Sequence, residues 1–201
     1  MSASLFRRAR FRLAASELAH LPPDEGREIA FAGRSNAGKS SALNALCDQT
    51  GLARTSKTPG RTQQLVVFDL EADRRLVDLP GYGYAKVPEA LRLHWRRVID
   101  AYLRERAALR GVVLIMDSRH PLKDFDRQML GYCRDIGLAC HVLLTKADKL
   151  GRGEATRALA AVRKAIADEH YGASVQLFSA HGKSGVDEAR CLLAAWLDAP
   201  A

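Results

Sequence analysis

Long hydrophobic runs are absent from this chain. The longest unbroken aliphatic stretch covers residues 112–116, whereas a helix that crosses a bilayer needs roughly 18 consecutive apolar residues. No apolar segment follows the arginines near the start of the sequence, so a secretory signal peptide is not expected. These absences exclude a membrane-spanning protein, and no membrane partner is expected.

Cysteine is scarce and follows no ligand or disulfide pattern. The four cysteines, Cys47, Cys133, Cys140 and Cys191, form neither a Cys-x-x-Cys pair nor a zinc-type spacing with histidine. We expect buried free thiols in a reducing compartment, which predicts a cytoplasmic protein. A secreted, disulfide-stabilised mini-domain and a zinc ribbon are excluded.

What the sequence does contain is typical of one globular domain. Its 201 residues are 47% apolar and 27% charged, and no internal repeat or coiled-coil heptad occurs, so a monomer is expected. Lysine and arginine outnumber the acids by 31 to 23, a net charge of +8 that favours polyanionic partners such as nucleic acid or acidic lipid. Residues 1–24 are expected to form a basic arm or short strand that packs on a domain at 25–201. The arm carries Arg7, Arg8, Arg10 and Arg12.

From Glu28 onward, short apolar segments alternate with longer segments of helical periodicity. Strands are expected at 29–32, 65–70, 76–79, 112–116, 142–144 and 175–178, and helices at 39–47, 89–106, 124–136, 154–169 and 186–197. This alternation predicts a three-layer α/β domain, with helices on both faces of a six-stranded, mostly parallel sheet. Too few residues join the second and third strands for a crossover helix, so one strand is expected to be antiparallel.

The segment 33–40 carries the clearest chemical signal. It reads Gly-Arg-Ser-Asn-Ala-Gly-Lys-Ser and matches GxxxxGK[ST] between an expected strand and an expected helix. Glycines let backbone N–H groups surround phosphate oxygens, and the helix start adds the positive end of its dipole. Lys39 is expected at the β- and γ-phosphates and Ser40 at Mg²⁺. Kinases, ATPases and GTPases share this loop, so it does not identify the base.

Two further segments predict how the metal and the base are bound. Asp78, before Leu79, Pro80 and Gly81, ends a strand and can hold Mg²⁺ through water, although such a segment alone is also a common surface turn. Asp148, at the end of the segment 145–148, can accept two hydrogen bonds from guanine, which adenine cannot supply. The alternative is that Asp148 caps a helix. After the last strand, the Ala180 N–H could reach the guanine O6.

Together with Thr62, the segments 33–40, 78–81, 145–148 and 179–180 resemble the five signatures of TRAFAC-type GTPases. In addition, SKTPGRTQ (56–63) and DLPGYGYA (78–85) resemble the EngB family, also called YihA or YsxC. The likeness covers nearly the whole chain. It implies a Ras-like P-loop fold and a GTP/GDP switch that hydrolyses GTP to GDP and phosphate. It also implies a role in assembling the large ribosomal subunit, with its rRNA as partner, and a requirement for normal cell division and septation.

The resemblance also assigns roles residue by residue. It makes Ser40 and Thr62 ligands of Mg²⁺, with Asp78 acting through water, and it makes Lys39, Thr62 and Gly81 the catalytic residues. The residues it places around GTP are Gly33, Arg34, Ser35, Asn36, Ala37, Gly38, Lys39, Ser40, Gly60, Arg61, Thr62, Gln63, Gln64, Asp78, Leu79, Pro80, Gly81, Thr145, Lys146, Ala147, Asp148, Ser179, Ala180 and His181.

Departures from the general GTPase pattern predict how the protein behaves. In Ras-like enzymes a glutamine shortly after this glycine orients the attacking water, but here Tyr82 follows Gly81 and no glutamine is available at that place. Slow intrinsic hydrolysis is therefore expected. Gln63 and Gln64 are expected to begin the next strand rather than to take over the role of that glutamine. In related GTPases an asparagine at the place of Asn36 helps to bind K⁺, and stimulation by K⁺ is a hypothesis on that basis. Thr145 replaces the usual asparagine, which predicts weaker tethering of the base loop and modest affinity.

Two questions stay open at this level. Thr62 is expected to close on Mg²⁺ and the γ-phosphate only with GTP, ordering the loop 49–61. The basic residues of the 89–106 helix suit either a solvated face or rRNA, and no RNA-binding signature decides between them. They are Arg92, Arg96, Arg97, Arg104 and Arg106. Besides a GTP-hydrolysing switch, a nucleotide-dependent RNA- or ribosome-binding module with negligible turnover and a P-loop kinase or ATPase remain alternatives.

Overall fold

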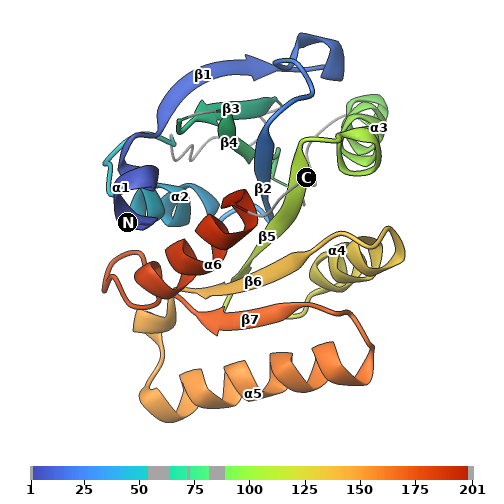
Figure 1. The fold of residues 1–201 in the computed structure, drawn as a ribbon. Coiled ribbons are helices and arrows are strands. Elements are labelled where there is room, and N and C mark those ends of the chain that lie inside the picture. Colours follow the sequence, from blue (N-terminus) through green and yellow to red (C-terminus); the bar gives the residue numbers. More distant parts are fainter. Residues whose placement is uncertain (1, 54–63, 72, 82–88, 199–201) are drawn as a thin grey trace.

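A computed structural model describes residues 2–53, 64–71, 73–81 and 89–198. Its helices are α1 (Ser2–Arg7), α2 (Lys39–Cys47), α3 (Glu89–Glu105), α4 (Asp124–Asp135), α5 (Arg152–Asp168) and α6 (Val186–Asp198), with 3₁₀ turns at Leu18–His20 and Ala147–Lys149. Its strands are β1 (Arg10–Ala15), β2 (Arg27–Gly33), β3 (Leu65–Asp69), β4 (Arg74–Asp78), β5 (Leu109–Asp117), β6 (Cys140–Thr145) and β7 (Ser174–Leu177). Figure 1 shows this alternation of strands and helices.

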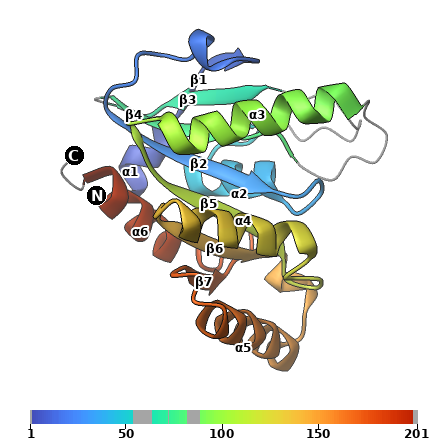
Figure 2. The same ribbon diagram turned by 90° about the vertical axis from the view of Figure 1, so that its right-hand side faces the viewer.

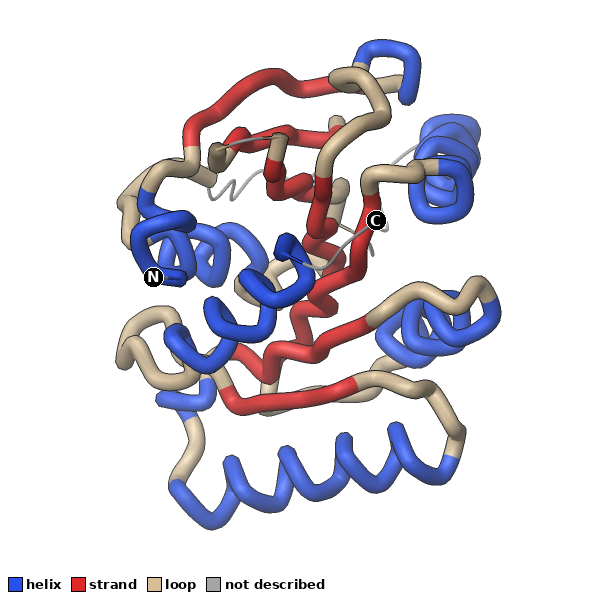
Figure 3. The backbone as a smooth tube through the Cα atoms, viewed as in Figure 1, coloured by secondary structure: helices blue, strands red, loops and turns tan. Residues whose placement is uncertain are grey.

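The strands form one sheet in the order β1-β3-β4-β2-β5-β6-β7 (Figure 3). β3 runs antiparallel to both of its neighbours, and the remaining pairs are parallel. The predicted mixed, mostly parallel sheet with one antiparallel strand is therefore confirmed. The predicted number of six strands is wrong, because the N-terminal segment supplies a seventh strand, β1, at the edge. A bulge between Phe11 and Leu13 disrupts the alternation by which such a strand is detected in a sequence.

Helices cover both faces of the sheet, as predicted. Consecutive residues of β2 point to opposite faces: Ile29 and Phe31 pack in the core beneath α1, α2 and α6, whereas Ala30 and Ala32 pack beneath α3, α4 and α5. Figure 2 shows α3 and α4 in front of the sheet and α2 behind it. The middle of each central strand is apolar because both of its faces are buried, and the polar residues of these strands lie toward their ends.

The start of β2 carries a buried charge cluster that changes the interpretation of one arginine. Glu28 is 1% exposed and accepts hydrogen bonds from Arg106 Nη2 at 2.6 Å, Tyr102 Oη at 3.0 Å and Arg75 Nη1 at 3.3 Å. α3 ends at Glu105, one residue earlier than predicted. The prediction that Arg106 belongs to a basic helix face is therefore wrong, whereas Arg96 and Arg97 are exposed.

Other predictions concern burial and the loops. Cys47, Cys133 and Cys140 are buried as predicted, but Cys191 is exposed.

Among the described residues, none of the helices combines the length and apolarity that a bilayer crossing requires. Gly60, Arg61, Thr62 and Gln63, most of the predicted switch loop 49–61, and the side chain of Arg92 lie outside what the structure describes.

Candidate functional site

The candidate site lies where the carboxyl ends of the parallel strands meet. β2 ends at Gly33, β4 at Asp78, β5 at Asp117 and β6 at Thr145, and the segment 179–181 follows β7. Open α/β sheets bind their ligands at this edge, because the loops there converge while the helices return to the opposite edge. The sheet therefore brings four of the five predicted segments together.

Glycines shape the phosphate loop, residues 33–40. A Cβ at Gly33 would lie 2.8 Å from the Ile115 carbonyl oxygen, so only glycine allows this approach of β2 to β5. Gly38 has a φ of 102° and immediately precedes α2, a conformation that glycine adopts at little cost. The loop consequently turns directly into the N-terminus of α2, whose backbone N–H groups face the carboxyl edge.

Lys39, the first residue of α2, forms an ion pair with Asp78 at the end of β4. Only 11% of the lysine side chain and 8% of the aspartate side chain are exposed. Burial raises the pKa of the Asp78 carboxyl, and the charge of Lys39 opposes that rise. Without phosphate, the cation of the loop is thus neutralised by the predicted metal-side acid.

The hydroxyl of Ser35 lies on the side of the phosphate loop that faces Gly81. Within the described part of the chain, the buried Ser35 Oγ has no hydrogen-bond partner. A Cβ at Gly81 would lie 3.7 Å from it, so the backbone at Gly81 faces the phosphate loop. A phosphate oxygen entering between these segments would satisfy the hydroxyl, because a buried polar group without a partner is costly.

The nearby oxygen atoms suit Mg²⁺. Mg²⁺ prefers hard oxygen ligands and commonly combines one or two protein groups with substrate phosphates. Ser40 at the start of α2 and Asp78 at the end of β4 supply a hydroxyl and a carboxylate at the same edge of the sheet. Ser40 and Asp78 therefore fit the predicted ion, whereas the structure does not describe Thr62.

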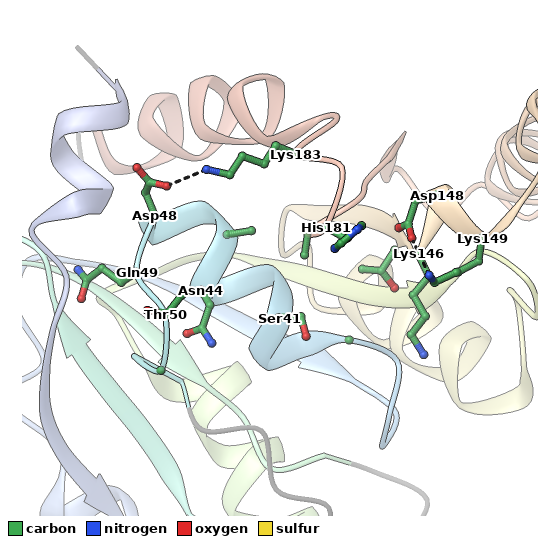
Figure 4. Close-up of a pocket in the computed structure, with 15 residues that line it drawn as sticks. Ser41, Asn44, Asp48, Gln49, Thr50, Lys146, Asp148, Lys149, His181 and Lys183 are labelled. Carbon is green, nitrogen blue, oxygen red and sulfur yellow. Dashed lines mark hydrogen bonds and ion pairs between the residues drawn. The ribbon is translucent and has the colours of Figure 1, made fainter.

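A cavity of about 680 Å³ lies beside the loop, between α2 and the segments that follow β6 and β7. Figure 4 shows Ser41 and Asn44 on the α2 side and Lys146, Asp148 and Lys149 on the other. The Ser179 hydroxyl donates to Asp148 Oδ1 at 2.6 Å and holds the pKa of this carboxyl below its usual value. An oriented, ionised carboxylate in a pocket of this size suits a purine with two adjacent donors.

Thr145 links the base segment to the phosphate loop. Its hydroxyl hydrogen-bonds to the Ala37 carbonyl and lies 3.0 Å from the Met116 carbonyl. The tether that this threonine was expected to weaken is therefore present, because the Thr145 hydroxyl reaches the Ala37 carbonyl of the phosphate loop. Whether affinity is modest stays a prediction.

Sequence reasoning missed Asp117. It is 7% exposed at the end of β5, and Lys146 Nζ lies 2.9 Å from its Oδ2. The same Nζ donates to the Asn36 carbonyl at 2.6 Å, so Lys146 spans the base segment and the phosphate loop. In the sequence, Asp117 is an acid directly after the expected strand 112–116, which could have marked it as a site residue. Its partner Lys146, however, lies 29 residues further along the chain.

The other predicted residues lie around the same edge. Ala180 and His181 line the cavity, and Arg34 points from the phosphate loop toward α4, with Nη2 3.2 Å from the His120 carbonyl. Asn36 is exposed with a φ of 61°. Gln64 is exposed just before β3, and its neighbour Gln63 is not described.

The fold and this arrangement of loops define a P-loop GTPase. A family model described as "50S ribosome-binding GTPase" matches residues 28–146. A probable GTP-binding protein EngB of Stenotrophomonas maltophilia is 60% identical over 195 residues, which cover 96% of this chain and 97% of the relative. The corresponding protein of Xanthomonas euvesicatoria is 58% identical over 96% of this chain and 94% of its own length. The chain belongs to the EngB family of GTP-binding proteins.

Solved structures support the same fold. A crystal structure of a probable GTP-binding protein engB has a TM-score of 0.67 at 18% sequence identity, and the alignment covers 85% of this chain and 98% of that one. A bacterial selenocysteine-specific elongation factor has a TM-score of 0.62, with 88% of this chain matching 29% of that one. At these identities the similarity concerns the fold alone.

Proposed function

We propose that this protein binds GTP with Mg²⁺ at the carboxyl edge of the sheet, hydrolyses it, and acts as a switch in assembly of the large ribosomal subunit. The observation that carries the nucleotide assignment is the cavity that places Asp148, held by Ser179, beside the phosphate loop. The name of the matching family model, which refers to 50S binding, supports the ribosomal partner. A cytoplasmic location and a requirement for cell division and septation follow from family membership as parts of the same proposal.

The chain's own residues divide the work of binding. Asp148 accepts from the base, and the Lys146 methylenes cover its plane. Lys39 leaves Asp78 for the β- and γ-phosphates. Ser40 and Thr62, with Asp78 through a water, would hold the metal. Bound Mg²⁺ would neutralise phosphate charge as the terminal phosphoryl group leaves. Gly81, whose backbone lies beside Ser35 of the phosphate loop, would donate its N–H to the γ-phosphate.

Calorimetry with pure protein and Mg²⁺ tests the nucleotide assignment. We expect GDP and GTP to bind and ATP to compete poorly, because adenine leaves the Asp148 carboxylate unpaired. A preference for ATP, or no heat with any guanine nucleotide, would reject the assignment. Comparing turnover in K⁺ and Na⁺ buffers tests whether Asn36 supports a K⁺ site; equal rates would reject that part alone.

A second candidate is a nucleotide-dependent ribosome-binding module with negligible turnover. The sequence observation in its favour is Tyr82 directly after Gly81, where no glutamine is available to orient water. Phosphate release with and without large-subunit precursor particles separates the two candidates. Acceleration by the particles supports the hydrolytic switch, whereas nucleotide-dependent binding without release supports the module. In either case, affinity for the particles should fall steeply with salt if rRNA phosphates are contacted.

A further inference from the structure

The loop between β5 and α4, residues 118–123, lies outside every segment that the sequence assigned to the nucleotide, yet it is tied to two of them. Immediately before the loop, Asp117 at the end of β5 is 7% exposed. Arg119 donates to Asp117 Oδ1 from its backbone N at 3.0 Å and from Nε at 2.9 Å, and to Oδ2 from Nη2 at 2.7 Å. Burial raises the pKa of this carboxyl, but the donors from Arg119 and Lys146 outweigh it, and the pKa lies below its usual range. Asp117 is a fixed anion.

The group that this anion holds on the site side is Lys146. Its Nζ lies 2.9 Å from Asp117 Oδ2 and 2.6 Å from the Asn36 carbonyl. Its backbone has a φ of 58°, a left-handed conformation that costs free energy outside glycine. Lysine is flexible, with about 2 kcal/mol of rotamer entropy to lose. A charged partner at the end of a rigid strand therefore decides where this side chain lies before any ligand arrives.

The same loop and the first turn of α4 also contact the phosphate loop, at Arg34. Arg34 Nη2 donates to the His120 carbonyl at 3.2 Å, and its Nε lies 3.5 Å from Asp126 Oδ1. The Asp126 side chain is fully buried, and its Oδ2 accepts from the Lys123 backbone N at 3.0 Å. The loop thus contacts the phosphate loop at Arg34 and, through Lys146, at Asn36.

We propose that Asp117 is a positioning residue for the nucleotide: it holds Lys146 across the base segment and the phosphate loop, and Arg119 in turn holds Asp117. This inference rests on the proposed binding of guanine nucleotide at the site. It predicts that Asp117 affects affinity through Lys146 and not through a contact of its own with the ligand. A role limited to fold stability would instead act on affinity independently of Lys146.

A double-mutant cycle separates these two roles. The variants are Asp117→Asn, Lys146→Met and the double variant, and the readout is GDP affinity with Mg²⁺ by fluorescence titration or calorimetry. We expect Asp117→Asn to weaken GDP binding roughly tenfold, as the loss of one charged hydrogen bond would. In the Lys146→Met background, the same substitution should change affinity by less than about twofold. Asp135→Asn is the matched control, because that carboxylate is exposed and pairs with its neighbour Arg134.

The outcomes are distinguishable from failure of the proposed function. If the unaltered protein binds no guanine nucleotide, both proposals are overturned. If it binds and Asp117→Asn binds equally well, or if the loss is the same in both backgrounds, only the positioning role is overturned. Should Asp117→Asn fail to fold, Arg119→Gln provides the second variant, since 42% of the Arg119 side chain is exposed. It should weaken GDP binding roughly threefold, again only when Lys146 is present; unchanged binding would reject the proposal.

Discussion

Replacing Lys39 by methionine should destabilise the nucleotide-free protein in a way that depends on pH. Lys39 and Asp78 are both about nine-tenths buried, so removing the lysine leaves a buried carboxylate without its counter-ion. Such a loss typically costs about 3–5 kcal/mol. This loss of stability has an upper limit, because the variant can instead fold with Asp78 protonated. Protonation costs about 1.4 kcal/mol for each pH unit above the ordinary pKa of the carboxyl.

That ordinary pKa is 3.8, so the limit is about 4.4 kcal/mol at pH 7 and about 1.6 kcal/mol at pH 5. The sign follows from linkage. A carboxyl whose pKa is raised in the folded state binds more protons there than in the unfolded chain, so lowering the pH favours the folded variant. The loss caused by Lys39→Met should therefore shrink as the pH falls.

Urea unfolding at pH 7 and pH 5, in EDTA and without nucleotide, measures this loss. Adding Asp78→Asn to Lys39→Met should recover most of the lost stability, because the uncompensated charge is then gone. Lys164→Met serves as the control: its ion pair with Asp168 is largely exposed and should contribute less than about 1 kcal/mol. Equal losses at both pH values, or no recovery in the double variant, would refute the reasoning.

Three further substitutions test other parts of the structure. Asp148→Asn should shift preference from guanine to xanthine nucleotides, since an amide suits the changed base edge; competition binding that still favours GDP would contradict this. Thr145→Val should weaken GDP binding roughly fivefold by removing one neutral hydrogen bond, and Thr145→Ser should restore it; unchanged titrations for the valine variant would show that the tether is unimportant. Burial lowers the pKa of His141 below its ordinary 6.5, so the unfolded chain binds more protons below that pH and stability should fall as the pH drops from about 6.5. Urea midpoints between pH 7 and 5.5 should fall less steeply for His141→Gln, and identical slopes would count against this role.

The central fold followed from the sequence because its signals are local. The unbroken apolar strand around residues 112–116 and the GxxxxGK[ST] loop each depend on neighbouring residues alone. The edge strand β1 was harder to predict because Arg10, Phe11 and Arg12 are all exposed, so no burial pattern distinguishes this strand from an arm. At an edge, backbone pairing rather than side-chain burial defines the strand.

The site was predictable in its segments but not in its pairings. Nothing near Asp117 in the sequence indicates that its carboxylate meets Lys146, because the parallel pairing of β5 and β6 creates that contact. Similarly, Arg106 follows a run of basic residues and looks like part of a charged surface. Only the return of the chain to the start of β2 places it against the buried Glu28. Contacts of this kind depend on tertiary structure and leave no trace in local periodicity.

The order β4-β2-β5 has an electrostatic consequence for the site. The phosphate loop leaves β2 between two strands that each end in a buried aspartate, Asp78 and Asp117, and each aspartate neutralises one lysine, Lys39 or Lys146. In the proposed function, Lys39 exchanges its carboxylate for phosphate, whereas Lys146 keeps its partner when the base binds. Removing the two negative charges should therefore have opposite effects.

In EDTA, Asp78→Asn should tighten GDP binding, because it frees Lys39 and removes an anion near the phosphates. Added Mg²⁺ should then improve its affinity less than it improves that of the unaltered protein, because a carboxylate of the metal site is gone. Asp117→Asn should weaken binding equally with and without Mg²⁺, since its effect passes through the base-side lysine. Titrating both variants with GDP in EDTA and in Mg²⁺ measures the contrast. If both variants lose the same affinity in EDTA, the two aspartates do not differ in the way that their lysines imply.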